Sequence, residues 1–400
     1  MRNPVLASRV PASTPRPGST ALRFVLLVGV MSLFADMAYE AARSITGPYL
    51  SLLGASAATV GIVAGGGELL GYSLRLVSGR LADVTGRYWP VTIVGYVVQM
   101  TAVPALALAG SWQVAAILMA LERTGKALRN PPRDAMLARA SRDIGRGWAF
   151  GLHEALDQLG AFVGPLVAAA ILAARGDYRL AFAVLLIPSG LTLTLLAAAR
   201  LTYPNPDALS ARPADVHVAG LGRDLRLYLV ATGLVAAGFA DFSLVSFHFA
   251  RTGTVPADLV PVFYAVAMGV GGLGSLVFGR AFDRLGIGVL VPLTIVSAAF
   301  APLAFLGGEW AALAGVALWG IGMGVHESIM AAAVPGMVAE TRVASAYGLF
   351  NLVYGLAWFA GSAAMGLLYD VSVPALVVFA VGAELLAVPF LLSVGRRPRP

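Results

Sequence analysis

The chain has no cysteine among its 400 residues. This absence excludes disulfide bridges, thiolate metal sites and a cysteine nucleophile. Charge is also scarce, since Asp, Glu, Lys and Arg make up 12% of the residues, against about 25% in a typical soluble domain. Hydrophobic residues make up 58% of the chain, and the mean hydropathy is +0.80. Most of the chain must therefore face lipid or other apolar helices, which predicts an all-α membrane protein.

Histidine is scarce as well, with four in the chain. Residues 153–157 and 326–330 each fall one residue short of the HExxH zinc motif, because the second histidine is missing in both. Residues 124–127 lack the first glycine and the final Ser or Thr of a P-loop, so ATP is not expected as the energy source. We therefore predict no metal site, no cofactor and no enzymatic activity. A membrane-embedded enzyme is kept as a distant alternative, without a nucleophile or metal set at workable spacing.

Apolar runs of about 20 residues, long enough to cross the hydrocarbon core of a bilayer, can be placed twelve times in the chain. We expect membrane-spanning helices at residues 22–45, 57–80, 89–109, 112–130, 147–174, 179–200, 225–250, 257–280, 287–307, 310–334, 343–369 and 372–394. Residues 201–222 are less apolar and contain three prolines. They are predicted to form a cytoplasmic linker between an N-terminal half, residues 21–200, and a C-terminal half, residues 223–395.

Basic residues indicate the orientation, because the cytoplasmic loops of membrane proteins are enriched in Arg and Lys. Of the 28 basic residues, 21 fall on the side of the N-terminal tail, and four fall on the opposite side at Arg43, Arg175, Arg179 and Arg251. Both termini are therefore expected in the cytoplasm, and the net charge of +7 follows membrane topology rather than a nucleic-acid surface. Residues 1–20, broken by four prolines, are predicted to be a disordered cytoplasmic tail rather than a signal peptide.

One charged turn occurs twice, about half a chain length apart. Residues 79–87 read Gly-Arg-Leu-Ala-Asp-Val-Thr-Gly-Arg, and residues 279–286 read Gly-Arg-Ala-Phe-Asp-Arg-Leu-Gly. A second similarity near the same offset joins Phe-Ala-Asp at 34–36 to Phe-Ala-Asp at 239–241. Repetition at half the chain length predicts two similar halves, a construction that many membrane transporters share.

The first turn resembles the signature between the second and third helices of the major facilitator superfamily, Gly-x-x-x-Asp-(x)-x-Gly-Arg. The resemblance implies twelve transmembrane helices in two pseudo-symmetric six-helix halves, and a secondary active transporter that works by alternating access. It also implies that helices 1, 4, 7 and 10 line the substrate cavity. The residues that it assigns to gating of the cytoplasmic side, with their second copy, are Gly79, Arg80, Asp83, Gly86, Arg87, Gly279 and Asp283.

Residues 160–165, Gly-Ala-Phe-Val-Gly-Pro, resemble the Gly-Pro motif of the exporter branches of that superfamily, although ordinary close packing through small residues explains them equally well. Together with the carboxylates inside the spans, this motif leads us to predict proton-coupled export by an antiporter of the drug/proton type. The expected partners are a small-molecule substrate, protons and the lipid bilayer. A lysine occurs only at Lys126, and this Arg-rich composition indicates a bacterial genome and hence the bacterial inner membrane. We expect a monomer.

Ionisable residues inside the predicted spans are functional candidates, because placing a charge in hydrocarbon costs about 2.5–3.5 kcal/mol on insertion scales. The carboxylates that we predict as candidates for the coupling proton are Asp36, Glu40, Glu68, Glu122 and Asp157. Asp36 is the first choice, because its helix lines the cavity in the superfamily that this chain resembles. The competing structural interpretation is that Asp36 pairs with Arg43, which follows it on the same helix face.

A second set of residues inside the spans carries hydrogen-bond donors, acceptors or positive charge. The candidates for substrate binding are Tyr39, Arg123, Lys126, Arg129, His153, Glu154, Asp241, His326 and Glu327. The basic residues of the fourth helix raise an alternative substrate class, an organic anion or phosphorylated metabolite held by charge-assisted hydrogen bonds. Uptake and export are both open for such a substrate.

The fourth helix has a structural alternative too. If its cations do not bind substrate, we expect them to bridge to the fifth helix, for example Lys126 to Asp157. We also expect the fourth helix to end at Pro131 and Pro132, because a proline disfavours helical geometry in the residue before it. That ending would put Arg133 and Asp134 at the cytoplasmic mouth.

Overall fold

The computed structural model describes residues 17–140, 146–204, 222–325, 329–338 and 343–394. Within these residues the chain is helical and has no strand. Nine segments have the length and hydropathy of a membrane span, and one of them, Val260–Leu306, has 47 residues and makes two crossings. The shorter apolar helix Glu309–Val325 and the charge-rich helix Trp112–Ala140 complete the twelve crossings. The prediction of a twelve-helix membrane protein is confirmed.

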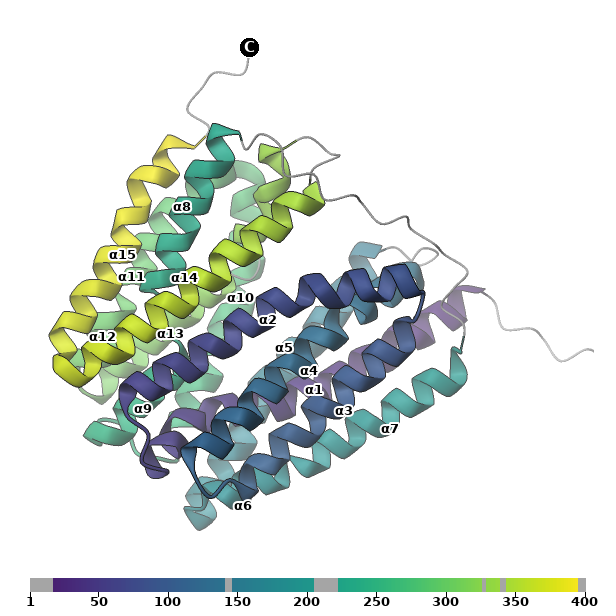
Figure 1. Cartoon of the computed structure of the whole chain (residues 1–400), viewed down its shortest axis with the longest axis horizontal. Coiled ribbons are helices and arrows are strands. Elements are labelled where there is room, and N and C mark those ends of the chain that lie inside the picture. The colour runs from purple at the N-terminus through teal and green to yellow at the C-terminus, as the bar shows by residue number, and fades with distance from the viewer. Residues whose placement is uncertain (1–16, 141–145, 205–221, 326–328, 339–342, 395–400) are drawn as a thin grey trace, which may run out of the picture.

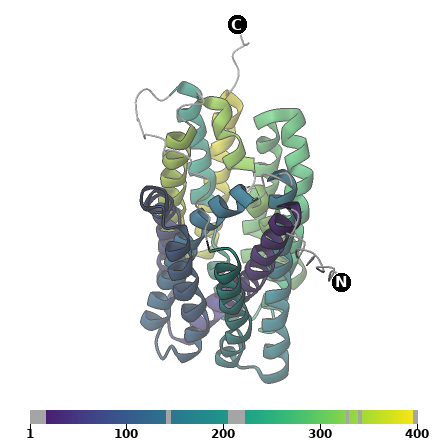
Figure 2. The same cartoon turned by 90° about the vertical axis from the view of Figure 1, so that its right-hand side faces the viewer.

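The twelve crossings form two groups of six. The helices of the first half are α1 (Pro17–Leu52), α2 (Ala57–Thr85), α3 (Tyr88–Ala105), α4 (Trp112–Ala140), α5 (Arg146–Arg175), α6 (Tyr178–Val184) and α7 (Leu186–Thr202). Those of the second half are α8 (Arg223–Gly238), α9 (Phe242–Thr252), α10 (Val260–Leu285), α11 (Leu290–Ala298), α12 (Phe300–Leu306), α13 (Glu309–Val325), α14 (Val343–Val371) and α15 (Val373–Ser393). The pairs α6–α7, α8–α9 and α11–α12 each make one interrupted crossing. Figures 1 and 2 show the two halves as separate groups of helices.

The halves meet mainly along three helix pairs, α2 with α14, α1 with α9 and α5 with α10 (Figure 1). A Cβ added at Gly47 of α1 would lie 2.1 Å from the carbonyl oxygen of Ser243, and one added at Gly61 of α2 would lie 2.2 Å from that of Ser362. Only glycine permits such an approach of two backbones. The halves therefore pack backbone to backbone toward the end of the molecule that carries the α1–α2 connection.

An interhelical hydrogen bond reinforces contact at that end. The backbone N–H of Ala58, in the first turn of α2, donates to Oδ2 of Asp370 near the end of α14, with a donor–acceptor distance of 3.1 Å. A carboxylate at a helix N-terminus satisfies a free N–H and complements the helix dipole. The duplicated turns lie at the C-terminal ends of α2 and α10. Three of their glycines are not closely packed, because a Cβ added at Gly86, Gly279 or Gly286 would meet no atom within 4 Å.

Two helix ends differ from the sequence predictions. The segment predicted as a tail, residues 1–20, becomes helical at Pro17, where α1 begins; proline fits the first turn because the N–H it lacks has no intrahelical partner there. The rest of that segment, like residues 205–221 of the predicted linker, lies outside the described residues. Helix α4 was expected to end at its prolines, and this was wrong, since it continues to Ala140.

A hydrogen bond from a serine of α2 compensates for the donor that α4 lacks at Pro131. Pro131 has no N–H to donate to the carbonyl of Ala127, four residues earlier. Oγ of Ser78, on α2, donates to that carbonyl instead, at 2.8 Å. As a consequence Arg133 is buried rather than exposed at a mouth, and its Nη1 donates to Oγ of Ser32 at 2.9 Å.

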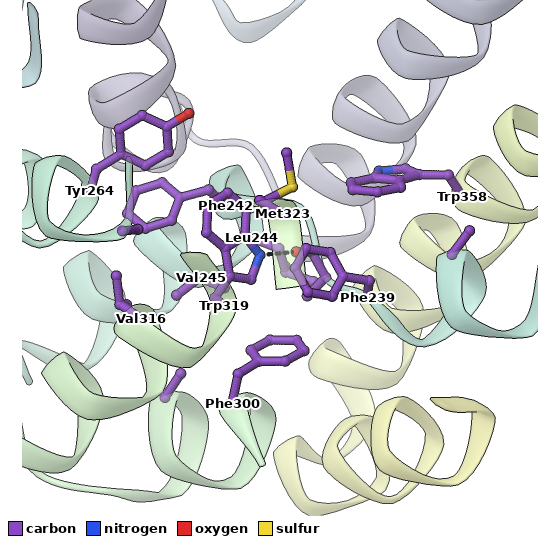
Figure 3. Packing of buried hydrophobic residues seen from close by; sticks show 14 of the residues in the cluster. Phe239, Phe242, Leu244, Val245, Tyr264, Phe300, Val316, Trp319, Met323 and Trp358 are labelled. Carbon is purple, nitrogen blue, oxygen red and sulfur yellow. Dashed lines mark hydrogen bonds between the residues drawn. The ribbon is translucent and has the colours of Figure 1, made fainter. Parts of the chain in front are cut away.

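The seventh crossing was predicted as one helix over residues 225–250, and this was wrong, because it breaks between α8 and α9. Asp241 begins α9 by accepting a hydrogen bond from the N–H of Ser243 at 2.8 Å. The break leaves the carbonyl of Ala240 without a helical donor, and Nε1 of Trp319 donates to it at 2.8 Å (Figure 3). The rings of Phe239 and Phe242 pack against Trp319. A buried aromatic cluster thus holds the break in a single geometry.

The Ser78 contact gives a test of the fold. Changing Ser78→Ala leaves the Ala127 carbonyl buried without its donor, which should lower the free energy of unfolding by about 1–3 kcal/mol. The measurement is thermal unfolding of the purified protein in detergent. Ser275→Ala is the matched control, because Oγ of Ser275 bonds only within its own helix, to the carbonyl of Gly272. Equal melting temperatures for the two variants would contradict this account of how α4 passes Pro131.

Candidate functional site

A set of buried charges lies where α1, α2 and α4 meet the start of α9. Its first member is Arg43 of α1, which is 7% exposed. Nη2 of Arg43 lies 3.2 Å from Oδ2 of Asp241 and 3.4 Å from Oε1 of Glu68. Since Glu68 belongs to the first half and Asp241 to the second, Arg43 joins the two halves. Arg43 was counted with the basic residues on the side opposite the N-terminal tail, and the structure buries it between the helices of the two halves.

Arg123 of α4 shares the same carboxylate. Its Nη2 lies 3.0 Å from Oε1 of Glu68, and its Nε lies 3.6 Å from Oε2 of the neighbouring Glu122. Nη1 also donates to the hydroxyl of Tyr39 on α1, and the guanidinium carbon lies 5.1 Å from the centre of the Tyr39 ring. Glu68 is therefore held by two arginines from different helices.

Arg129, two turns along α4, is almost fully buried, with 1% of its side chain exposed. Its three nitrogens donate to Gln99, Tyr96 and Asp36, at 2.5, 2.9 and 3.2 Å. The amide of Gln99 also donates to Oε1 of Glu122 at 3.1 Å. Because each of its three nitrogens donates to a partner within the first half, the geometry of Arg129 is that of a structural residue.

This arrangement decides the partner of Asp36. The structural alternative from the sequence, a pair between Asp36 and Arg43, was wrong, since Asp36 pairs with Arg129. Asp36 and Arg43 do have the spacing of residues on one helix face, but the cation that contacts Asp36 comes from α4. Gln99 and Tyr96 were not among the predicted site residues. The one available signal was an amide in the middle of the third apolar run.

Two residues of the site have no ion pair within 4.0 Å in the part of the chain that the structure describes. Glu40 of α1 accepts a hydrogen bond at Oε2 from the hydroxyl of Tyr264 on α10, at 2.5 Å. Lys126 of α4 places its Nζ 3.6 Å from the centre of the Tyr39 ring, a cation–π contact. The bond from Tyr264 is a further link between the halves, and no sequence motif marked that tyrosine.

We name these residues the central charge network: Glu40, Arg43, Glu68, Glu122, Arg123, Lys126 and Asp241. It holds four carboxylates and three cations. The neighbouring pair Asp36–Arg129 adds one charge of each sign and leaves the difference unchanged. If every member is ionised, the network carries a net charge of −1.

The predicted candidates on α5 lie apart from the network. Nε2 of His153 is 3.4 Å from Oδ2 of Asp157, one turn away on the same helix. Glu154 is exposed and accepts a hydrogen bond from Gln158 at 3.0 Å. The expected bridge from Lys126 to Asp157 was wrong, because Lys126 contacts Tyr39 instead. His326 and Glu327 lie outside the described residues.

The first duplicated turn is tied to α4. The hydroxyl of Tyr88 donates to Oδ1 of Asp83 at 2.7 Å and accepts from Nη2 of Arg139 at 2.6 Å. Gly86 ends α2 with a φ of +66°, a left-handed conformation that favours glycine. Arg80 and Arg87 are exposed. The two turns are not equivalent, since Asp283 is exposed and makes no hydrogen bond or ion pair to any described residue.

Comparisons with known proteins agree with this architecture. A family model described as Major Facilitator Superfamily matches residues 26–362. An uncharacterized protein of Mycobacterium tuberculosis is 41% identical over 402 residues, which cover 99% of this chain and 98% of the relative. An uncharacterized MFS-type transporter of Methanocaldococcus jannaschii is 26% identical over 372 residues, covering 87% of this chain and 89% of that protein. The crystal structure of the nucleoside transporter NupG has a TM-score of 0.75 at 12% identity, covering 94% of this chain and 100% of that one, a likeness of fold alone.

The contact between Arg43 and Asp241 can be tested by a double-mutant cycle. Arg43→Gln leaves a buried carboxylate without its partner, and Asp241→Asn does the reverse while keeping a side chain that can begin α9. We expect the double variant to be about 0.5–3 kcal/mol more stable than the sum of the single changes predicts. Thermal unfolding of the four proteins measures this.

The control cycle uses Arg133 with Asp134, because the Asp134 side chain is 44% exposed. A pair with one solvent-exposed partner should couple by less than about 1 kcal/mol. Additive effects at Arg43 and Asp241 would contradict the proposed link between the halves.

Proposed function

The chain belongs to the major facilitator superfamily and is a multi-pass secondary transporter, and we propose that it exports a small solute in exchange for protons. The observation that carries the proposal is the unequal number of acids and bases in the central charge network. A buried net charge is costly, because the water that would solvate it is excluded. One bound proton makes the network neutral. The network therefore has a place for the proton that such a transporter carries.

Glu40 is the carboxylate that we propose for this proton. It is the acid of the network without a cation within 4.0 Å among the described residues, whereas Glu68, Glu122 and Asp241 each contact an arginine. Asp36 stays a candidate from the sequence. Its ion pair with Arg129 lies within the first half, so a change in its charge acts less directly on the other half.

The contact between Glu40 and Tyr264 suggests how proton binding is linked to movement. An ionised carboxylate can only accept a hydrogen bond, whereas a protonated one can also donate. Because Tyr264 lies on α10 and Glu40 on α1, the link between the halves differs in the two states. A ligand drives a conformational change through such a difference in interaction free energy.

The packing of the halves supports alternating access. The glycine contacts and the bond from Ala58 to Asp370 hold the halves together toward the α1–α2 connection. With the orientation predicted from the arginines, that end faces outward and the duplicated turns face the cytoplasm of a bacterial cell. The conformation would then be closed to the outside. Transport requires these contacts to separate while Asp83 and its second copy approach the other half.

The experiment begins with a thermal-shift screen of small molecules at two pH values, because a bound substrate raises the melting temperature. A compound found in this way is then used with proteoliposomes. Glu40→Gln keeps the size of the side chain but cannot ionise, so we expect it to abolish accumulation driven by a pH gradient. Exchange of the compound down its own gradient should remain.

Asp36→Asn is the control for this variant. We expect it to accumulate the compound at a reduced rate, because it disturbs the Arg129 contacts without removing the proton site. If Glu40→Gln concentrates the compound with the pH dependence of the unaltered protein, Glu40 is not the coupling residue. If only Asp36→Asn loses accumulation, Asp36 rather than Glu40 is the coupling residue.

A second candidate function is transport of an organic anion or phosphorylated metabolite. It is favoured by Lys126, whose ammonium group contacts an aromatic ring and no carboxylate within 4.0 Å among the described residues. Arg75 on α2 is similar, with its guanidinium carbon 5.5 Å from the centre of the Tyr72 ring and no ion pair in that part of the chain. Both cations have donors available for an anionic group.

Substitution of Lys126 tests this second candidate. Lys126→Ala should weaken binding of an anionic compound by about 2–3 kcal/mol, as expected when a charge-assisted hydrogen bond is lost, with little change in melting temperature. Arg129→Ala is the contrasting variant, and it should lower the melting temperature because Arg129 holds three buried partners. Unchanged affinity in Lys126→Ala, measured by isothermal titration, would rule out the anion as the substrate class.

A further inference from the structure

A carboxylate of the second half is buried without an ion pair to any described residue. Glu384 of α15 is 0% exposed, and neither of its oxygens accepts or donates a hydrogen bond in the described structure. It belongs to neither the central charge network nor the duplicated turns. A carboxyl group in this position loses its hydration and gains no charged partner among the described residues, so we ask what it could bind.

Two hydroxyl groups lie in the same part of the second half and also have no hydrogen-bond partner. They are Oγ of Ser297 and Oγ1 of Thr294, on α11, and their residues are 3% and 2% exposed. The two are three residues apart and so share one helix face. Ser297 lies beside the Glu384 carboxyl, and α11 packs along α15. Three buried side chains thus bring unused oxygen atoms to one side of α15.

The broken crossing supplies the third component. Helix α8 ends at Gly238, where an added Cβ would lie 2.9 Å from Cγ of Glu384. The end of a helix leaves backbone carbonyls without intrahelical donors. In interrupted helices of transporters, such carbonyls coordinate small cations. The end of α8 therefore lies against the side chain of Glu384, the carboxylate that has no cation among the described residues.

We propose that Glu384, Ser297 and the C-terminal end of α8 form a binding site for Na⁺, with Thr294 as a further oxygen ligand. Oxygen ligands only, with a single carboxylate, favour a hard ion of charge +1, since one ion then neutralises the site. Divalent ions prefer several carboxylates, and the described residues contain no group of three acids or histidines that could hold one.

The site has a structural consequence that is separate from proton coupling. Gly238 is followed directly by the break, and the break ends at Asp241, which binds Arg43. On its other side Ser297 lies against the break, because a Cβ added at Gly322 would meet both Oγ of Ser297 and the ring of Phe239, at 2.6 and 2.5 Å (Figure 3 shows Phe239). An ion bound here would hold the break, and through Asp241 the contact between the halves.

The test is thermal unfolding of the full chain in NaCl, KCl and choline chloride at one ionic strength. We expect the melting temperature to rise by a few degrees with increasing NaCl, because a ligand that binds the folded state stabilises it. KCl should act more weakly, and choline chloride should have no effect. The NaCl-dependent rise should be lost in Glu384→Gln and reduced in Ser297→Ala. It should be unchanged in the control Glu309→Gln, whose side chain is exposed at the start of α13.

The salt titration of the unaltered protein tests the proposed Na⁺ site even if a variant does not fold. Equal melting temperatures in the three salts would overturn the proposal and leave Glu384 as a neutral, protonated acid. A rise with NaCl that persists in Glu384→Gln would also overturn it, because the ion would then bind elsewhere. Neither result bears on Glu40, whose test uses a pH gradient.

Discussion

The fold depends on one constraint, that a charge buried between membrane helices must be compensated by another group. Arg43 meets this constraint with two carboxylates from different halves, Glu68 and Asp241. Arg123 shares Glu68, and Gln99 connects Glu122 to Arg129. The charges that reduce the hydropathy of α1, α2 and α4 therefore join these helices to one another and to the start of α9. The same contacts form the candidate site, so the residues that hold the helices together are also those that we propose for transport.

Compensation also explains why several helices are irregular. The break at residues 239–241 puts Asp241 at the start of α9, where it caps the helix and meets Arg43. Trp319 then satisfies the carbonyl that the break exposes. In α4, Ser78 donates to the Ala127 carbonyl that Pro131 leaves without a donor, and the helix continues and carries Arg133 into the interior. In each case a side chain from a neighbouring helix replaces a missing backbone donor.

Much of this architecture could be predicted from the sequence. Run length and hydropathy suffice to place twelve crossings, because a helix must be long and apolar to cross the membrane, and the duplicated turn indicated the two halves. The partners within the network could not be predicted. Spacing along one helix suggested Asp36 with Arg43, but the actual partners come from α4 and α9 and depend on how helices are rotated and packed. The prediction of an uninterrupted seventh helix was wrong for a similar reason, because tertiary contacts of Trp319 and Arg43 stabilise a break that local propensity does not favour.

We propose that the protonation state of the central charge network sets the conformational equilibrium between the two halves. The absence of cysteine allows two labels to be introduced without background. Val84→Cys and Leu285→Cys place spin labels at exposed positions beside the two duplicated turns. Pulsed electron resonance then measures the distance between the labels in acidic and in alkaline buffer. The account predicts two distance populations whose ratio changes with pH and becomes independent of pH when Glu40→Gln is added. A single distance distribution, the same in both buffers, would contradict it.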